Sequence, residues 1–118
     1  MTDNATMTIS ELAKAIITLA SEKNVMLVLA ESCTGGMIAA ALTDIAGSSA
    51  VLDRGLVTYS NQAKQDLLGV NDDILASYGA VSAETAIAMT TGALLKTPAA
   101  QLAASVTGIA GPGGGSQD

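Results

Sequence analysis

Three short, largely apolar runs constrain the fold of this 118-residue chain more than any other feature. They cover residues 25–30 (VMLVLA), 55–60 (GLVTYS) and 100–106 (AQLAASV), and each is followed by a polar or glycine-containing turn. Runs of this length are typical of strands that are covered on both faces. Segments with helical spacing separate them. The pattern predicts a single α/β domain over 1–118, a three-layer sandwich with a mostly parallel central sheet flanked by helices.

Capping signals predict where the helices begin and end. Thr8 and Glu11 have the spacing of a capping box, which opens a helix over 9–23. The stripe Ile38, Leu42 and Ile45 predicts a second helix that ends at Gly47.

The second half of the chain has similar signals. Asn61 is a candidate cap for a helix over 61–68 that Gly69 ends, and residues 71–75 can add a helical turn. Ser82 opens a longer helix that extends to Lys96. In such folds, binding loops gather at the carboxyl ends of the strands. These loops are 31–36 (ESCTGG), 58–64 (TYSNQAK) and 107–115 (TGIAGPGGG).

Composition excludes several classes of function. The formal net charge is −6, which argues against nucleic acid as a partner. The sequence has no histidine and one cysteine, so Ser-His-Asp chemistry, Cys-His chemistry and multi-cysteine metal sites are ruled out. No signal peptide and no apolar run of about 20 residues is present, which predicts a cytoplasmic protein without a membrane segment.

Two segments could carry chemistry, and each has a plainer interpretation. The turn 31–36 can form a cradle for an oxyanion or a phosphate, or it can be an ordinary turn in which Ser32 or Thr34 caps the next helix. Cys33 is more typical of small core filler than of a nucleophile. Lys64 can act as a base towards Ser60 if a helix end and burial lower its pKa, although by itself the pattern favours a solvated surface lysine.

Four segments together resemble the CinA C-terminal family, the nicotinamide-nucleotide amidases. They are 30–36 (AESCTGG), 44–64 (DIAGSSAVLDRGLVTYSNQAK), 79–85 (GAVSAET) and 106–116 (VTGIAGPGGGS). The resemblance implies hydrolysis of the carboxamide of nicotinamide mononucleotide to nicotinate mononucleotide and ammonia, in pyridine nucleotide recycling. It implies no cofactor and no metal, a small nucleotide as the partner, and a possible homodimer.

The resemblance also assigns site residues. Ser48 matches the family's proposed nucleophile and Lys64 its proposed general base, with Tyr59 as a third catalytic residue. The expected substrate-binding residues come from the turns after the first and third strands: Ser32, Thr34, Gly35, Thr107 and Gly108.

Family domains continue beyond the GGS segment with further strands, a terminal helix and basic residues that help to hold the nucleotide. We therefore expect a domain that lacks its C-terminal part. The alternative function is a non-catalytic module, a remnant of that domain that binds a nucleotide or a protein.

Overall fold

A computed structural model of the chain describes residues 6–110. It confirms the α/β class. In chain order the elements are α1 (Ile9–Lys23), β1 (Leu27–Glu31), α2 (Met37–Thr43), the short 3-10 helix η2 (Ser48–Ala50), β2 (Leu52–Val57), α3 (Asn61–Leu68), α4 (Asp72–Tyr78), α5 (Ala83–Lys96) and β3 (Leu102–Val106).

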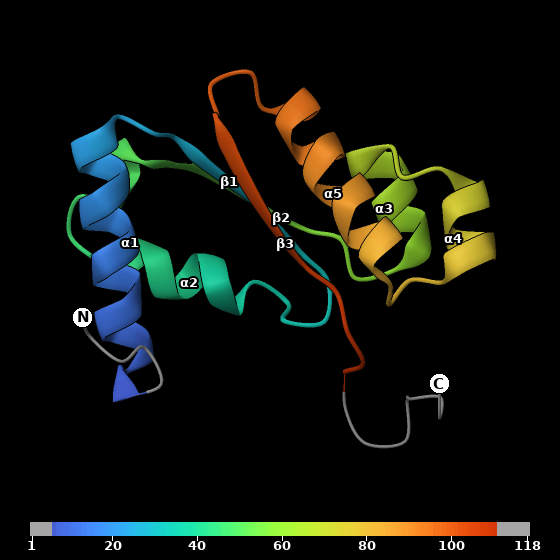
Figure 1. Cartoon of the computed structure of the whole chain (residues 1–118), viewed down its shortest axis with the longest axis horizontal. Coiled ribbons are helices and arrows are strands. Elements are labelled where there is room, and N and C mark those ends of the chain that lie inside the picture. The colour runs from blue at the N-terminus through green and yellow to red at the C-terminus, as the bar shows by residue number, and fades with distance from the viewer. Residues whose placement is uncertain (1–5, 111–118) are drawn as a thin grey trace.

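The three strands form one parallel sheet in the order β2-β1-β3. Leu27 pairs with Leu52 and Leu102 where the strands begin, and Glu31 pairs with Val57 and Val106 where they end. Helices α1 and α2 lie on one face of the sheet, and α3, α4 and α5 lie on the other (Figure 1). The fold is therefore the expected three-layer sandwich.

The central strand β1 supplies both halves of the core. Its side chains alternate between the two faces, so Leu27 and Leu29 pack with α1 and α2 while Val28 and Ala30 pack with the helices of the other layer. All five residues of β1 are buried. The prediction of a strand covered on both faces is thus confirmed for β1. It is wrong for the edge strands β2 and β3, which are partly exposed.

Glycine at position 92 lets two helices touch. A Cβ atom at Gly92 of α5 would lie 1.9 Å from the main-chain oxygen of Leu68 at the end of α3. No side chain fits in that space, so α3 and α5 pack backbone against backbone at this point.

Most predicted helix starts are confirmed. The Thr8 and Glu11 capping box is formed in both directions, and Ser82 caps α5 through the N–H of Thr85. The cap of α3 is Ser60, whose hydroxyl accepts from the N–H of Ala63, and the prediction of Asn61 in that role was wrong by one residue. Asn71 is the cap of α4.

Two boundaries differ from expectation for physical reasons. Helix α2 ends at Thr43, because the chain then turns into η2. Gly47, with φ 88°, is the N-cap of η2 and not the C-cap of α2. Strand β2 begins three residues earlier than expected, at Leu52, and includes the polar residues Asp53 and Arg54. An edge strand tolerates polar side chains that a central strand would not. Within residues 6–110, no helix combines the length and apolar character that a bilayer span requires.

Candidate functional site

The three strands end side by side, and the loops that follow them are joined by main-chain hydrogen bonds. Ser32, directly after β1, donates its N–H to the oxygen of Val106 at 2.9 Å. Thr58, directly after β2, donates its N–H to the oxygen of Glu31 at 2.7 Å. The parallel register therefore brings three sequence segments that are far apart to one edge of the sheet.

Lys64 reaches into this edge from the first turn of α3. Its side chain is 1% exposed. Nζ donates to three oxygens: Ser32 Oγ at 2.8 Å, the Thr58 carbonyl at 2.9 Å and the Tyr59 carbonyl at 3.0 Å. The interpretation of Lys64 as a solvated surface lysine was wrong. Ser32 is 5% exposed, so both members of the pair are buried.

Burial lowers the pKa of Lys64. Loss of solvent disfavours the charged amine, and this effect outweighs the opposing electrostatic effect of the Cys33 side chain. No carboxylate among the described residues forms an ion pair with Lys64. In the structure the Ser32 hydroxyl donates to the Tyr59 carbonyl at 3.3 Å. A neutral Lys64 amine would keep two N–H groups for the carbonyls of Thr58 and Tyr59, and its lone pair would be free to accept the Ser32 proton. The geometry suits proton transfer from Ser32 to Lys64.

The other predicted residues have different contacts. Tyr59 takes part through its main-chain oxygen, while its side chain is 62% exposed. The Thr107 hydroxyl donates to the oxygen of Ala80 at 2.7 Å, which fixes the loop after β3 against the turn before α5. The Ser60 hydroxyl caps α3 and is not directed at Lys64.

Glycines 35 and 108 shape the loops around Ser32. Gly35 has φ +62°, a conformation that side chains disfavour. A Cβ atom at Gly108 would lie 3.1 Å from Cys33 Sγ, so the loop after β3 passes close to the turn that carries Ser32. Gly35 is therefore favoured by its backbone conformation, and Gly108 by the close approach of the two loops. The remainder of the glycine-rich segment, 111–118, lies outside the described residues.

Ser48 does not meet Lys64 within the chain. Its hydroxyl donates to the oxygen of Thr43 at 3.4 Å, and it lies in η2, before β2 begins. Lys64 lies after β2 ends, and six residues of strand span about 20 Å. Within the chain, Lys64 therefore contacts Ser32 and not Ser48.

Glu31 fills the position that the sequence suggested for an anion. Its carboxylate accepts from the Thr34 hydroxyl at 2.7 Å and from the N–H groups of Ile38 at 3.0 Å and Ala39 at 2.9 Å. Burial alone raises the pKa of this carboxyl, but the hydrogen bonds from Thr34, Ala39, Ile38 and Gly36 together hold it below its ordinary value. The N–H groups at the start of α2 thus already donate to a carboxylate, and neither Ser32 nor Thr34 caps the helix.

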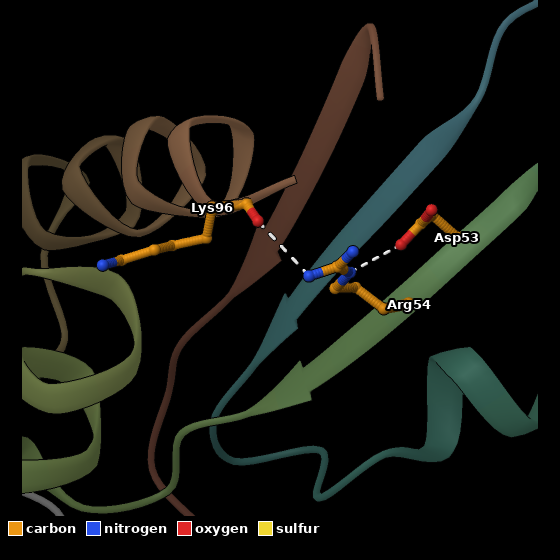
Figure 2. Close-up of polar contacts among 3 residues, drawn as sticks. All are labelled: Asp53, Arg54 and Lys96. Carbon is orange, nitrogen blue, oxygen red and sulfur yellow. Dashed lines mark hydrogen bonds and ion pairs between the residues drawn. The ribbon is translucent and has the colours of Figure 1, made fainter. Parts of the chain in front are cut away.

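The remaining cations lie elsewhere. Lys14 and Lys23 belong to α1 and are exposed. Arg54 of β2 pairs with Asp53 and donates to the carbonyl of Lys96 at 3.3 Å, which ties β2 to the C-terminal end of α5 (Figure 2). These residues and Lys64 are all the cations of the sequence. Within residues 6–110, Lys64 is therefore the only side-chain cation with a hydrogen bond to the loops at the carboxyl ends of the strands.

Comparisons with known proteins agree with this architecture. The CinA C-terminal domain profile matches residues 9–118. The chain is 47% identical over 118 residues to a protein of Escherichia coli K12 named nicotinamide-nucleotide amidohydrolase PncC, and covers 69% of its length. It is 57% identical over 104 residues, 88% of the chain, to a CinA-like protein of Geobacter sulfurreducens, but covers only 25% of that protein.

Solved structures are similar over nearly the whole chain. A competence/damage inducible protein of Agrobacterium tumefaciens has a TM-score of 0.88 and 59% identity, and the match covers 92% of this chain and 66% of that one. A CinA superfamily protein of Escherichia coli has a TM-score of 0.90 and 36% identity, with 98% and 66% covered. The profile match over most of the chain, and these shared folds, show that the chain belongs to the CinA C-terminal domain family.

Proposed function

We propose that this domain hydrolyses the carboxamide of nicotinamide mononucleotide to nicotinate mononucleotide and ammonia, with Ser32 as the nucleophile and Lys64 as its base. The observation that carries the proposal is the 2.8 Å contact between Ser32 Oγ and a buried lysine amine whose pKa is lowered. Serine-lysine pairs are a known means of activating a hydroxyl without histidine. The substrate is suggested by the name of the Escherichia coli relative.

The reaction would proceed in two halves. Lys64 takes the hydroxyl proton while Ser32 Oγ attacks the carboxamide carbon, which gives a tetrahedral oxyanion. The carbon–nitrogen bond then breaks, the proton on Lys64 passes to the leaving nitrogen, and ammonia departs from a Ser32 ester. Water, deprotonated by Lys64, attacks the ester carbon, and the proton returns to Ser32 as the carboxylic acid leaves.

Main-chain donors near Ser32 would stabilise the oxyanion. In the described part of the chain, the N–H groups of Cys33 and Thr34 donate to no acceptor, and they directly follow the nucleophile. An N–H of the residue after a catalytic serine serves this purpose in other hydrolases. The Thr34 hydroxyl is already engaged with Glu31, so the proposal assigns it no substrate contact.

The direct test is ammonia release from nicotinamide mononucleotide. We would assay the 118-residue chain beside a version extended with the C-terminal third of the Escherichia coli relative, each as wild type and as Ser32→Ala. Release in either form that Ser32→Ala abolishes supports the proposal. Silence in both forms would favour the alternative, a module that binds a nucleotide or a protein without turning it over.

A further inference from the structure

The carboxylate of Glu31 is buried beside the reactive pair without a cation. The residue is 1% exposed, it is the last residue of β1, and it directly precedes Ser32. Within residues 6–110 its side chain accepts hydrogen bonds from O–H and N–H donors and forms no ion pair; the donors belong to Thr34, Gly36, Ile38 and Ala39. Burying a charge is unfavourable unless hydrogen bonds replace the lost water, so these donors must remain in place around it.

This arrangement does more than cap a helix. A cap is ordinarily a short polar side chain at the first boundary residue. Here that residue is Gly36, which has no side chain to offer, and the acceptor reaches back from the strand instead. The Glu31 side chain therefore links the end of β1 to the first turn of α2 and spans the turn that carries Ser32.

The main-chain oxygen of Glu31 supports the other half of the pair. It accepts from the N–H of Thr58 at 2.7 Å and from the Thr58 hydroxyl at 3.5 Å. The Thr58 carbonyl in turn accepts from Lys64 Nζ at 2.9 Å. Glu31 is thus one hydrogen-bonded residue away from Lys64 and one covalent bond away from Ser32.

We propose that Glu31 is the positioning residue of the Ser32–Lys64 pair, holding the nucleophile through its carboxylate and the base through its main-chain oxygen. The inference rests on the proposed function, since it assigns a role only within that pair. It names no contact between Glu31 and the substrate. Its effect is on the distance and orientation between Ser32 Oγ and Lys64 Nζ.

The test is Glu31→Gln in the full chain, read out by the reaction of Ser32 with a small serine-directed fluorophosphonate. Glutamine keeps the size of the side chain but turns an NH₂ group towards donors, which leaves at least one of them unpaired. We expect the labelling rate of Ser32, located by mass spectrometry of its peptide, to fall roughly 10- to 100-fold. The circular dichroism spectrum should remain that of the folded protein.

A second pair of variants covers the case in which Glu31→Gln fails to fold. Thr34→Val removes one donor from the carboxylate and keeps the shape of the side chain, whereas Thr34→Ser retains the hydroxyl. We expect Thr34→Val to slow labelling several-fold and Thr34→Ser to restore most of the rate. If Glu31 only stabilised the fold, Thr34→Val and Thr34→Ser variants of equal stability would label at the same rate.

The matched control is Asn71→Ala, which removes a helix cap from α4 and leaves the hydrogen bonds of Glu31, Ser32 and Lys64 in place. It should label at the wild-type rate. The proposal is overturned if Glu31→Gln labels within about twofold of wild type, or if Asn71→Ala slows labelling as much as Glu31→Gln does. A wild-type chain that does not label at Ser32 would count against the pair itself, and the positioning role would fall with it.

Discussion

Lys64 Nζ lies 2.8 Å from Ser32 Oγ, although 32 positions separate the two residues in the chain. The contact exists because β1 and β2 are parallel neighbours, so that the loops following them share one edge of the sheet. Two main-chain carbonyls complete the surroundings of the amine. The pair is therefore held by the sheet and not by a single loop.

Ser32→Ala should remove amidase activity, because it deletes the only hydroxyl that contacts the Lys64 amine in the described part of the chain. We expect kcat to fall by roughly 10³-fold or more, with the melting temperature little changed. Ser48→Ala, the comparison variant, should retain most of its turnover. The reverse result, an active Ser32→Ala and an inactive Ser48→Ala, would restore Ser48 as the nucleophile and require it to meet a lysine outside its own chain.

The pH dependence of turnover should follow Lys64. Because burial lowers the pKa of this amine, kcat/KM should rise with pH and level off below 10.5, the ordinary value for lysine. Lys64→Arg, which stays protonated at every pH of the assay, should be inactive throughout. A rising limb that survives in Lys64→Arg would show that another group titrates.

Stability should also depend on Lys64, with a defined sign. The unfolded chain holds a proton on this lysine up to about its ordinary pKa of 10.5, whereas the folded chain releases it at lower pH. Between those two values the unfolded state binds more protons, so the free energy of unfolding rises with pH. Relative to Lys64→Met, the free energy of unfolding of the wild type should rise by up to about 1.4 kcal/mol per pH unit in this window, as measured by urea unfolding. Parallel curves for the two proteins would contradict the lowered pKa.

Gly92→Ala should destabilise the fold, against the ordinary helix preference. In an exposed helix this change stabilises by about 1 kcal/mol. At this position the new methyl group would collide with the main-chain oxygen of Leu68, so we expect a loss of roughly 3 kcal/mol or more in the free energy of unfolding. Thr91→Ala, one residue earlier on the exposed side of α5, is the control and should change stability little. Equal stability of Gly92→Ala and wild type would mean that α3 and α5 separate more easily than their packing indicates.

Local signals predicted the elements well where one residue decides the outcome. Thr8 with Glu11, Ser82 and Gly69 each satisfy a helix end through a contact within a few residues, and all three are confirmed. Asn61 was misjudged because its neighbour can perform the same task, and Gly47 because α2 ends earlier than its apolar stripe suggested. Ser60 caps α3, and the chain leaves α2 before Gly47 is reached.

The reactive pair could not be predicted from local pattern, because its burial is a tertiary effect. Lys64 is one charged residue on a short polar helix, and its amine meets its partners only when the loops after β1 and β2 come together. Glu31 was missed for the same reason: its partners lie three, seven and eight positions ahead and come together only when α2 forms. A carboxylate that ends an otherwise apolar strand, directly before a turn of small residues, is the signal that could have pointed to it.

The parallel pairing of β1 and β2 also has a kinetic consequence. Paired residues of β1 and β2 lie 25 or 26 positions apart in the chain. Closing such a separation costs chain entropy before any contact is gained, so parallel pairs of this kind form late in folding compared with local helices. The helices of this chain could therefore be complete while Ser32 and Lys64 are still apart. The labelling rate of Ser32 during refolding would therefore report when β1 and β2 pair, independently of helix formation followed by circular dichroism.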